Sequence, residues 1–463
     1  MSNSADGLLK NIARVLSANF VVAFVGLVGS FIFPRILSIE AYAIYHTFTL
    51  YTGYITALHF GFASGMTIRY AGKNYNKINT AQYKSEIMLL LCIWGLFTLI
   101  FVVVSIPLKS EMLLYVALSI IPIGLVGSYK SFLQAWTRFR TFSVISSLLA
   151  VIVPVTAIIY YLITHDLPGN IYIIIFLVIN WIATVYVFFE ILKKIKGVKS
   201  AKIFSKYNLE TEKIGFAILI GNYINILLTS ADKQFVKWFF STNEFAFYSF
   251  AMSMQSIMTV FITSIAQPLF PAMAQGKFKD EDYSQIKDLL FIFGSLSGCA
   301  YFVLSIVVNQ FIVKYIPSLE VIGIYFVVFP VMAVINCLYI NLYKIKEMMK
   351  TYVVTLAGVL LIAVLLNTAF TYWFGKYTGV AIATTITYFI WFFIGVVQFK
   401  FIKISAKDII YLVIYIVIFF SITRFENDYL GFIIYLASIV TLDSVCYGKI
   451  LMQYSSKLLR RKF

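Results

Sequence analysis

Two stretches of this chain, "IEAYAIYHTF" at residues 39–48 and "TNEFAFYSFA" at residues 242–251, carry nearly the same pattern. Tyr42–Tyr45 in the first stretch matches Phe245–Tyr248 in the second, at an offset of 203 residues. The same offset lays "ANF" (18–20) on "GNY" (221–223). A repeat at one fixed offset indicates that a structural unit occurs twice in the chain.

The composition decides the class of protein in which this repeat occurs. Of the 463 residues, 61% are hydrophobic and only 12% are charged. Soluble globular chains have about 45–50% apolar and ~25% charged residues, so this chain is expected to have lipid as its solvent. The four cysteines and three histidines are scattered. Their spacing fits neither a disulfide framework nor a zinc site, and we expect no metal and no cofactor.

The apolar runs predict an all-α polytopic membrane protein with about fourteen spans. They lie near residues 12–33, 41–63, 87–108, 112–129, 142–163, 171–192, 214–235, 245–270, 289–312, 319–342, 352–373, 379–399, 409–422 and 430–447. These runs suit membrane helices and are too long for barrel strands of ~9–11 residues. The first run lacks the pattern of a cleaved signal, and we interpret it as a retained helix.

The basic residues predict the orientation of these spans. With the N-terminus in the cytoplasm, 30 of the 37 Lys and Arg residues fall on the cytoplasmic side. Cytoplasmic loops are enriched in Lys and Arg, so both termini are expected in the cytoplasm. The net charge of +17 then reflects topology and contact with anionic lipids, and it does not indicate nucleic-acid binding.

The repeat predicts how the spans are grouped. Six spans separate the two copies, so both copies run in the same direction. This arrangement predicts two six-helix lobes related by a pseudo-twofold axis along the membrane normal, with alternating access between them. The predicted parts are an N-lobe at 1–192, a basic linker at 193–213, a C-lobe at 214–403, and two extra helices with a basic tail at 404–463.

Polar side chains recur on one face of the first two spans of each lobe. Polar groups do not face hydrocarbon cheaply, so these faces are expected to turn inward. For the Ser, Thr and Gly positions of these faces, close helix packing is the favoured explanation. For five larger polar residues we predict a hydrated cavity: Asn19, His46, Asn222, Asn225 and Gln267.

Four basic residues of the first lobe are candidates for binding phosphate at the cytoplasmic mouth: Arg14, Arg69, Lys73 and Arg138. Arg presents a planar fork that matches phosphate oxygens, and Lys presents a point charge. The competing explanation is the general excess of positive charge on the inner side. That excess explains Arg14 and Arg69 least well, because both lie within or at the end of apolar runs.

Asp232 and Lys233 lie near the outer end of the seventh predicted span. One interpretation is a solvated pair at the membrane interface, and the other is a gate or coupling site. No G-x-x-x-x-G-K-[ST] motif occurs in the sequence, so direct use of ATP is not expected.

The segments "SANFVVAFVGLVGSFIFPRILSIEAYAIY" (17–45) and "TSADKQFVKWFFSTNEFAFYSFA" (229–251) carry a family resemblance. Each resembles the opening of a lobe in bacterial polysaccharide repeat-unit flippases of the O-antigen (Wzx) type. These belong to the multidrug, oligosaccharidyl-lipid and polysaccharide exporter superfamily. The resemblance implies a transporter that is not an enzyme. Its substrate would be an undecaprenyl-pyrophosphate-linked oligosaccharide, moved from the inner to the outer leaflet of the bacterial cytoplasmic (inner) membrane, as in lipopolysaccharide synthesis. The predicted hydrated cavity would then hold the glycan. Membrane lipids, a polysaccharide polymerase and a chain-length regulator are the implied partners.

Related flippases of lipid-linked peptidoglycan precursors rely on cavity arginines in their early helices, and Arg14 and Arg69 match them by location only. The chain has no clear deep arginine in its second lobe. One alternative function is a cation-coupled multidrug or toxin exporter of the same superfamily. Such exporters usually carry a membrane-embedded acid in the first lobe, and the first two spans contain none. The other alternative, a membrane-embedded polymerase or ligase, predicts a long outer loop with paired catalytic groups, and the outer loops here are short.

Overall fold

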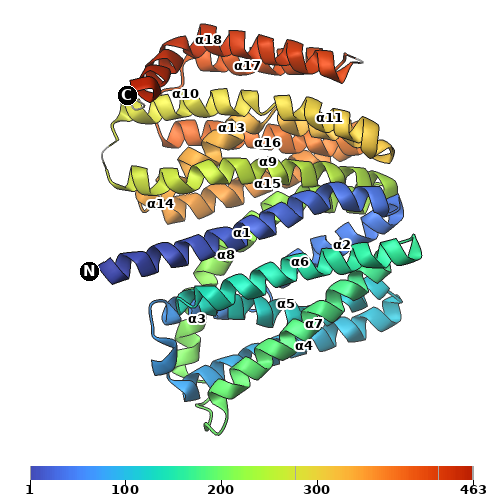
Figure 1. Ribbon diagram of the computed structural model, residues 1–463, viewed down its shortest axis with the longest axis vertical. Helices are drawn as coiled ribbons and strands as arrows, with labels where there is room; N and C mark the ends of the chain where they lie inside the picture. Colours follow the sequence, from blue (N-terminus) through green and yellow to red (C-terminus); the bar gives the residue numbers. More distant parts are fainter. Residues whose placement is uncertain (1, 277, 426, 461–463) are drawn as a thin grey trace. The chain divides into compact units, whose positions relative to one another are not determined.

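The computed structural model describes residues 2–276, 278–425 and 427–460. Side chains are described at 17, 19–216, 218–276, 278–425 and 427–452. Within these residues, eleven helices are long and apolar enough to cross a membrane, or twelve if one bent pair is a single span. The prediction of an all-α polytopic membrane protein is confirmed (Figure 1).

The chain divides into two compact units, residues 1–227 and 228–463, and the boundary falls inside helix α8 (Lys206–Phe239). Unit 1 also holds α1 (Ser2–Ile36), α2 (Ile39–Ile55), α3 (Phe62–Tyr70), η1 (Tyr75–Lys77), α4 (Thr80–Leu108), α5 (Glu111–Ala135), α6 (Phe139–Thr164) and α7 (Gly169–Ile195). The first part of unit 2 holds α9 (Thr242–Ala274), α10 (Asp280–Leu296), α11 (Cys299–Phe311), η2 (Val313–Tyr315), α12 (Ser318–Phe326), α13 (Phe329–Val334), η3 (Ile335–Tyr339) and α14 (Ile340–Ile345). The rest of unit 2 is α15 (Met349–Phe374), α16 (Tyr377–Gln398), α17 (Ala406–Ile422) and α18 (Asp428–Arg460). The pseudo-twofold relation between two lobes remains a prediction.

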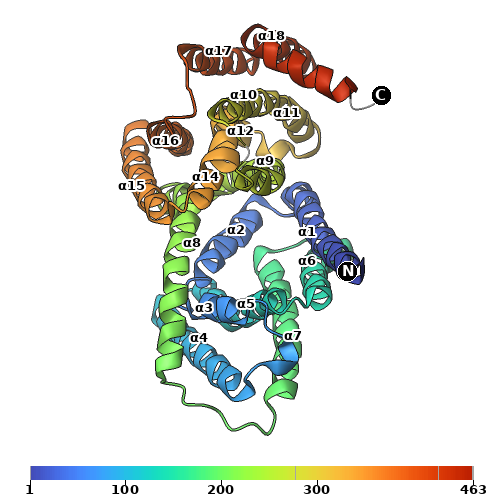
Figure 2. The ribbon, with the colours of Figure 1, turned by 90° about the vertical axis from the view of Figure 1, so that its left-hand side faces the viewer.

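Helix α5 forms the centre of unit 1, where it packs against α4, α7, α2 and α3. The Trp94 side chain is fully buried in this core. A Cβ atom at Gly124 of α5 would lie 2.5 Å from the Trp94 ring, so this contact requires glycine. Helices α1 and α6 run side by side on the same unit (Figures 1 and 2).

The second predicted span, 41–63, is not one continuous helix. It breaks between α2 and α3, where Phe60 has φ 48° and Gly61 has φ 96°. Two successive left-handed residues cannot continue a right-handed helix, and Gly61 tolerates this conformation without a Cβ clash. Past the break, Gly61 and Gly65 touch the backbone of Gly215 and Thr211, so α3 and the start of α8 meet backbone to backbone.

Unit 2 contains a second broken span. Helices α12 and α13 are bent by 53° relative to each other, and Pro330 lies in the first turn of α13. Proline is tolerated in a first turn because its missing N–H has no partner there. Helix α9 packs against α12 and η3, and α15 packs against α16.

Buried polar contacts attach α17 and α18, which run side by side, to α10 (Figure 1). Lys287 of α10 lies 2.6 Å from Asp408 of α17 and 2.9 Å from Asp288. The Tyr435 hydroxyl of α18 donates to the Ser295 carbonyl of α10 at 2.7 Å. Buried charges require such partners, so these ion pairs and hydrogen bonds fix where the two last helices sit on unit 2.

Candidate functional site

An aromatic cluster closes one end of unit 1. It consists of Tyr70, Tyr75, Tyr83, Phe132 and Trp136, contributed by α3, η1, α4 and the end of α5. The rings of Tyr70 and Tyr75 lie 5.5 and 4.9 Å from that of Trp136, in tilted and edge-on arrangements. Aromatic pairs prefer these geometries, so the cluster is a rigid support for the groups around it.

Three basic side chains, Lys73, Arg138 and Lys194, lie over rings of this cluster, and Arg69, next to Tyr70 in the chain, lies over the Tyr207 ring of α8. We call these four residues the cation cluster. Arg138 Cζ lies 4.6 Å from the centroid of the Tyr75 ring, and Lys194 Nζ lies 4.5 Å from the same centroid. Lys73 Nζ lies 6.0 Å from the Tyr70 centroid. A cation held by a ring face keeps its N–H groups available for anion oxygens.

Arg69 is partly enclosed. Its side chain is 15% exposed, and Cζ lies 3.9 Å from the centroid of the Tyr207 ring on α8. Nη2 also lies 3.4 Å from Oε2 of Glu210, whose side chain is 52% exposed. Sequence reasoning placed Tyr207 and Glu210 in a basic linker and assigned them no role. Arg14 lies outside the residues whose side chains are described.

The connection between α7 and α8 is tied to the start of α4. The Gln82 side chain donates to Asn208 Oδ1 at 2.6 Å, and Asn208 Nδ2 donates to the Ser85 hydroxyl at 3.2 Å. Lys84 Nζ donates to the Val198 carbonyl at 2.8 Å. These hydrogen bonds fix the first turn of α8, and with it Tyr207 and Glu210, beside α3.

A small cavity of about 130 Å³ lies in unit 1 at the break between α2 and α3. Its polar lining comes from Thr56, His59, Ser64, Thr67, Ser128 and Ser131. The Gly61 N–H donates to His59 Nδ1 at 2.9 Å, which leaves Nε2 of a neutral ring as the donor. Hydroxyls and an imidazole suit sugar hydroxyl groups. Sequence reasoning missed this cavity, because scattered serines and threonines are also ordinary packing residues.

The residues predicted to line a glycan cavity fall into two groups. Asn19, Asn222, Asn225 and Gln267 are exposed. His46 is 8% exposed, and its ring centroid lies 4.3 Å from that of Tyr42. These four side chains lie at the surface of the described chain, whereas His46 is packed among aromatic rings. Whether they line one cavity stays a prediction.

Asp232 of α8 is the centre of a buried polar group in unit 2. It is 3% exposed, and its Oδ2 accepts hydrogen bonds from the Tyr325 and Tyr248 hydroxyls at 2.6 and 3.0 Å. The Thr384 hydroxyl lies 3.4 Å from the same oxygen, and the Lys233 backbone N–H donates to Oδ1 at 2.6 Å. This burial favours a gate or coupling site over a solvated pair at the interface.

A cavity of about 10 Å³ adjoins Asp232, which is room for about one water-sized occupant. Asn367 of α15 lines it at 1% exposure, and neither polar atom of its amide has a partner among the described atoms. The Trp391 indole N–H, which also lines the cavity, has none either within the described chain. Buried polar groups normally have partners, so unpaired ones beside a buried carboxylate indicate a place for a small occupant.

The comparison with known families gives one match. Residues 8–277, more than half of the chain, match the model of a family described as polysaccharide biosynthesis protein. The chain belongs to this family. No curated protein matches it closely.

Membership in this family connects the chain with polysaccharide synthesis or export. The matched region contains the whole cation cluster, the hydroxyl-lined cavity and Asp232, whereas Asn367 lies beyond it. Among the described residues, no three His, Cys, Asp or Glu side chains gather into a metal-binding group.

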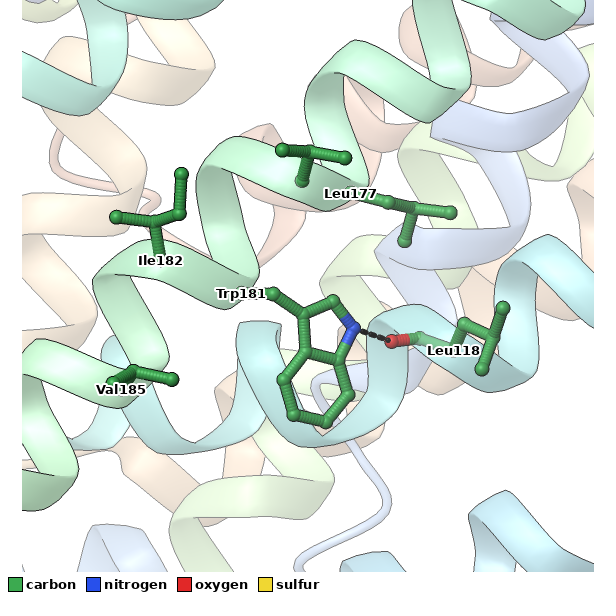
Figure 3. A pocket seen from close by; sticks show the side chains of 6 residues that line it. Leu118, Leu177, Trp181, Ile182 and Val185 are labelled. Carbon is green, nitrogen blue, oxygen red and sulfur yellow. Dashed lines mark hydrogen bonds between the residues drawn. The ribbon is translucent and has the colours of Figure 1, made fainter.

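An apolar groove of about 430 Å³ lies between α5 and α7 in this family member. Leu118, Leu177, Val178, Trp181, Ile182 and Val185 line it. Its one polar group is the Trp181 indole, which donates to the Leu118 carbonyl at 3.1 Å (Figure 3). The groove therefore suits hydrocarbon, and it carries none of the charge that a phosphate needs.

Proposed function

We propose that this protein is a flippase that moves an undecaprenyl-pyrophosphate-linked oligosaccharide repeat unit from the inner to the outer leaflet of the bacterial cytoplasmic membrane. The observation that carries the proposal is the cation cluster on its aromatic support, in a multi-pass member of a polysaccharide biosynthesis family. Lipid-linked saccharides carry their charge on phosphate at the membrane surface, which is where such cations would meet it.

In this mechanism the pyrophosphate binds first. Arg69 offers a planar donor edge, and Lys73, Arg138 and Lys194 add positive charge around the same aromatic cluster. Charge-assisted hydrogen bonds of this kind are roughly twice as strong as neutral ones. On the topology that the basic residues predict, this cluster would lie at the cytoplasmic mouth, with both termini in the cytoplasm.

The sugar next to the phosphates would enter the hydroxyl-lined cavity. Ser64 and Thr67 of that cavity lie on α3, the helix that carries Arg69. A helix rises ~1.5 Å per residue, so these side chains lie within the reach of one phosphate-linked sugar. The remaining glycan would pass Asn19, Asn222, Asn225 and Gln267 as the two lobes alternate access.

The polyprenyl tail would stay in the bilayer. Moving it through a polar path would expose apolar surface, at a cost of about 0.8 kcal/mol per CH₂ group. Only the charged and hydroxylated head therefore needs a protein pathway, and the lobes can open laterally to lipid on the tail side.

The Asp232 site would couple this cycle to a proton or a small monovalent cation. Its carboxylate is enclosed by tyrosine hydroxyls, and its cavity admits one small occupant. This feature also favours the second candidate, a cation-coupled drug exporter. The cation cluster distinguishes the two functions, because it suits an anionic substrate.

The experiment is a deletion of the gene in its own host, followed by complementation. A flippase defect should abolish surface glycan and accumulate the lipid-linked repeat unit on the cytoplasmic leaflet of spheroplasts. Normal surface glycan in the deletion strain, together with a gain of sensitivity to cationic drugs, would favour the exporter.

A further inference from the structure

The starting observation is that Arg69 already has an anionic partner within unit 1. Its guanidinium touches Glu210 through a single contact of 3.4 Å between Nη2 and Oε2. The strongest Arg–carboxylate pairs form two parallel hydrogen bonds at shorter distances. The pair is therefore loose, and its carboxylate can be exchanged for another anion.

The two partners differ in exposure. The Arg69 side chain is 15% exposed and rests on the Tyr207 ring, whereas the Glu210 side chain is 52% exposed. A charge enclosed to this degree is less stable when it loses its counter-ion. Glu210 can leave for solvent cheaply, whereas the enclosed Arg69 favours an anion beside it and also interacts electrostatically with the buried Glu86 carboxylate.

The backbone beneath Glu210 is held in place. Asn208 donates to the Ser85 hydroxyl at 3.2 Å and to the Ile203 carbonyl at 2.7 Å, which fixes the first turn of α8 beside α4. A tethered carboxylate has a high effective concentration at Arg69 without being bound there tightly. It can therefore swing away and return without rearrangement of the helix.

We propose that Glu210 is a tethered counter-anion that exchanges with the pyrophosphate of the substrate on Arg69. This inference rests on the proposed function. In the unloaded protein Glu210 neutralises Arg69. An arriving diphosphate displaces it, and the returning carboxylate helps to release the diphosphate when the head group moves on. Glu210 is thus a positioning residue that sets affinity and release.

This exchange predicts opposite effects of one substitution on binding and on turnover. Glu210→Gln removes the competitor, so the affinity for diphosphate should rise about tenfold, within the usual range of coupling between sites. The same change removes the carboxylate that assists release, so transport should slow. A purely structural role for Glu210 would lower both quantities together.

The binding experiment uses the full-length protein in lipid nanodiscs, titrated with sodium pyrophosphate in a calorimeter at fixed ionic strength. Glu210→Gln should bind about tenfold more tightly than the wild type, and Glu210→Asp should stay within about threefold. The matched control is Glu212→Gln, which removes the same charge two residues further along α8 and should change the affinity less than twofold. Arg69→Gln should lose binding, and the double variant Arg69→Gln, Glu210→Gln should match it.

The outcomes separate this inference from the proposed function. If Arg69→Gln binds pyrophosphate like the wild type, the assignment of the phosphate site to Arg69 is wrong. If Arg69→Gln loses binding while Glu210→Gln is unchanged or weaker, only the exchange is wrong. Surface glycan measured at equal protein level completes the test, and a rise in display for Glu210→Gln would contradict the role in release.

Discussion

The cation cluster of unit 1 and the Asp232 site of unit 2 hold their charges in opposite ways. The cations rest on the faces of Tyr70, Tyr75 and Tyr207, and ring faces leave N–H groups free. Asp232 is 3% exposed, and hydroxyl and backbone donors surround both of its oxygens.

The difference indicates what each site can bind. A cation on an aromatic support keeps N–H groups directed away from the ring, and it can exchange a loosely held partner for a large anion that arrives from solvent or the membrane surface. A carboxylate enclosed by fixed donors has room only for a proton or a small cation, and its protonation changes the local charge where the dielectric is low. The first arrangement suits recognition of a substrate, and the second suits coupling.

The largest effect is expected from reversing the charge at Arg69. Arg69→Lys should keep partial surface glycan, Arg69→Ala should lose it by about 10- to 100-fold, and Arg69→Glu should be worst. This range follows from the ~1.5–3 kcal/mol of a hydrogen bond to a charged group. Display is scored at equal protein level in the membrane. Normal display in an Arg14→Ala, Arg69→Ala double variant would mean that neither residue binds phosphate and that their charges serve only the membrane topology.

A smaller effect is expected from removing the charge of the coupling site. Asp232→Asn keeps the size of the side chain but cannot exchange a proton or hold a cation, so transport should fall about tenfold. Pyrophosphate binding to the nanodisc-embedded variant should be unchanged, which separates coupling from recognition. Ser253→Ala, on the neighbouring helix α9, is the control and should transport normally. Equal loss of binding and transport in Asp232→Asn would mean that the two sites are not distinct.

The sequence was enough to predict the membrane helices and to single out Asp232 as a candidate. It did not predict which residues surround Asp232 or the cation cluster. Long apolar runs predict membrane helices because the bilayer leaves the backbone few alternatives. A carboxylate inside such a run can be recognised as a candidate functional residue without knowledge of its neighbours in space. Asn367 did not stand out, because its meaning comes from contact with a helix that lies far away in the sequence.

The same limit applies to the cation cluster. Arg69, Lys73 and Arg138 could be predicted as candidates because their charges lie at the ends of apolar runs. Lys194 and Glu210 lie in a stretch with many lysines, where topology already explains the charge. The break at Phe60 and Gly61 was missed because φ is a property of the folded backbone, and the apolar pattern continues through it.

A more modest effect is expected from filling the hydroxyl-lined cavity. A Cβ atom at Gly127 would meet nothing within 4 Å, so Gly127→Leu can extend into the cavity that Gly127 lines. Loss of about one hydrogen bond to a sugar, ~1 kcal/mol, should lower transport roughly fivefold and leave pyrophosphate binding intact. Gly95→Leu is the matched control, because a Cβ there also meets open space and Gly95 does not line this cavity. Equal transport by both variants would contradict the proposal that this cavity binds a sugar.

The smallest effect is expected at the Tyr75 ring, where Arg138 and Lys194 share one aromatic partner at 4.6 and 4.5 Å. An exposed cation–π contact contributes about 0.5–1 kcal/mol, and either cation can supply charge to the same phosphate. Arg138→Ala and Lys194→Ala should therefore each lower pyrophosphate affinity by less than about threefold, while the double variant should lose more than the product of the two. This excess is the signature of a shared site.

The control is Lys193→Ala, which removes an adjacent lysine paired with Glu190 at 2.7 Å and should leave the affinity unchanged. Purely multiplicative losses would mean that the two cations act on different anions, and the cation cluster would then be two sites.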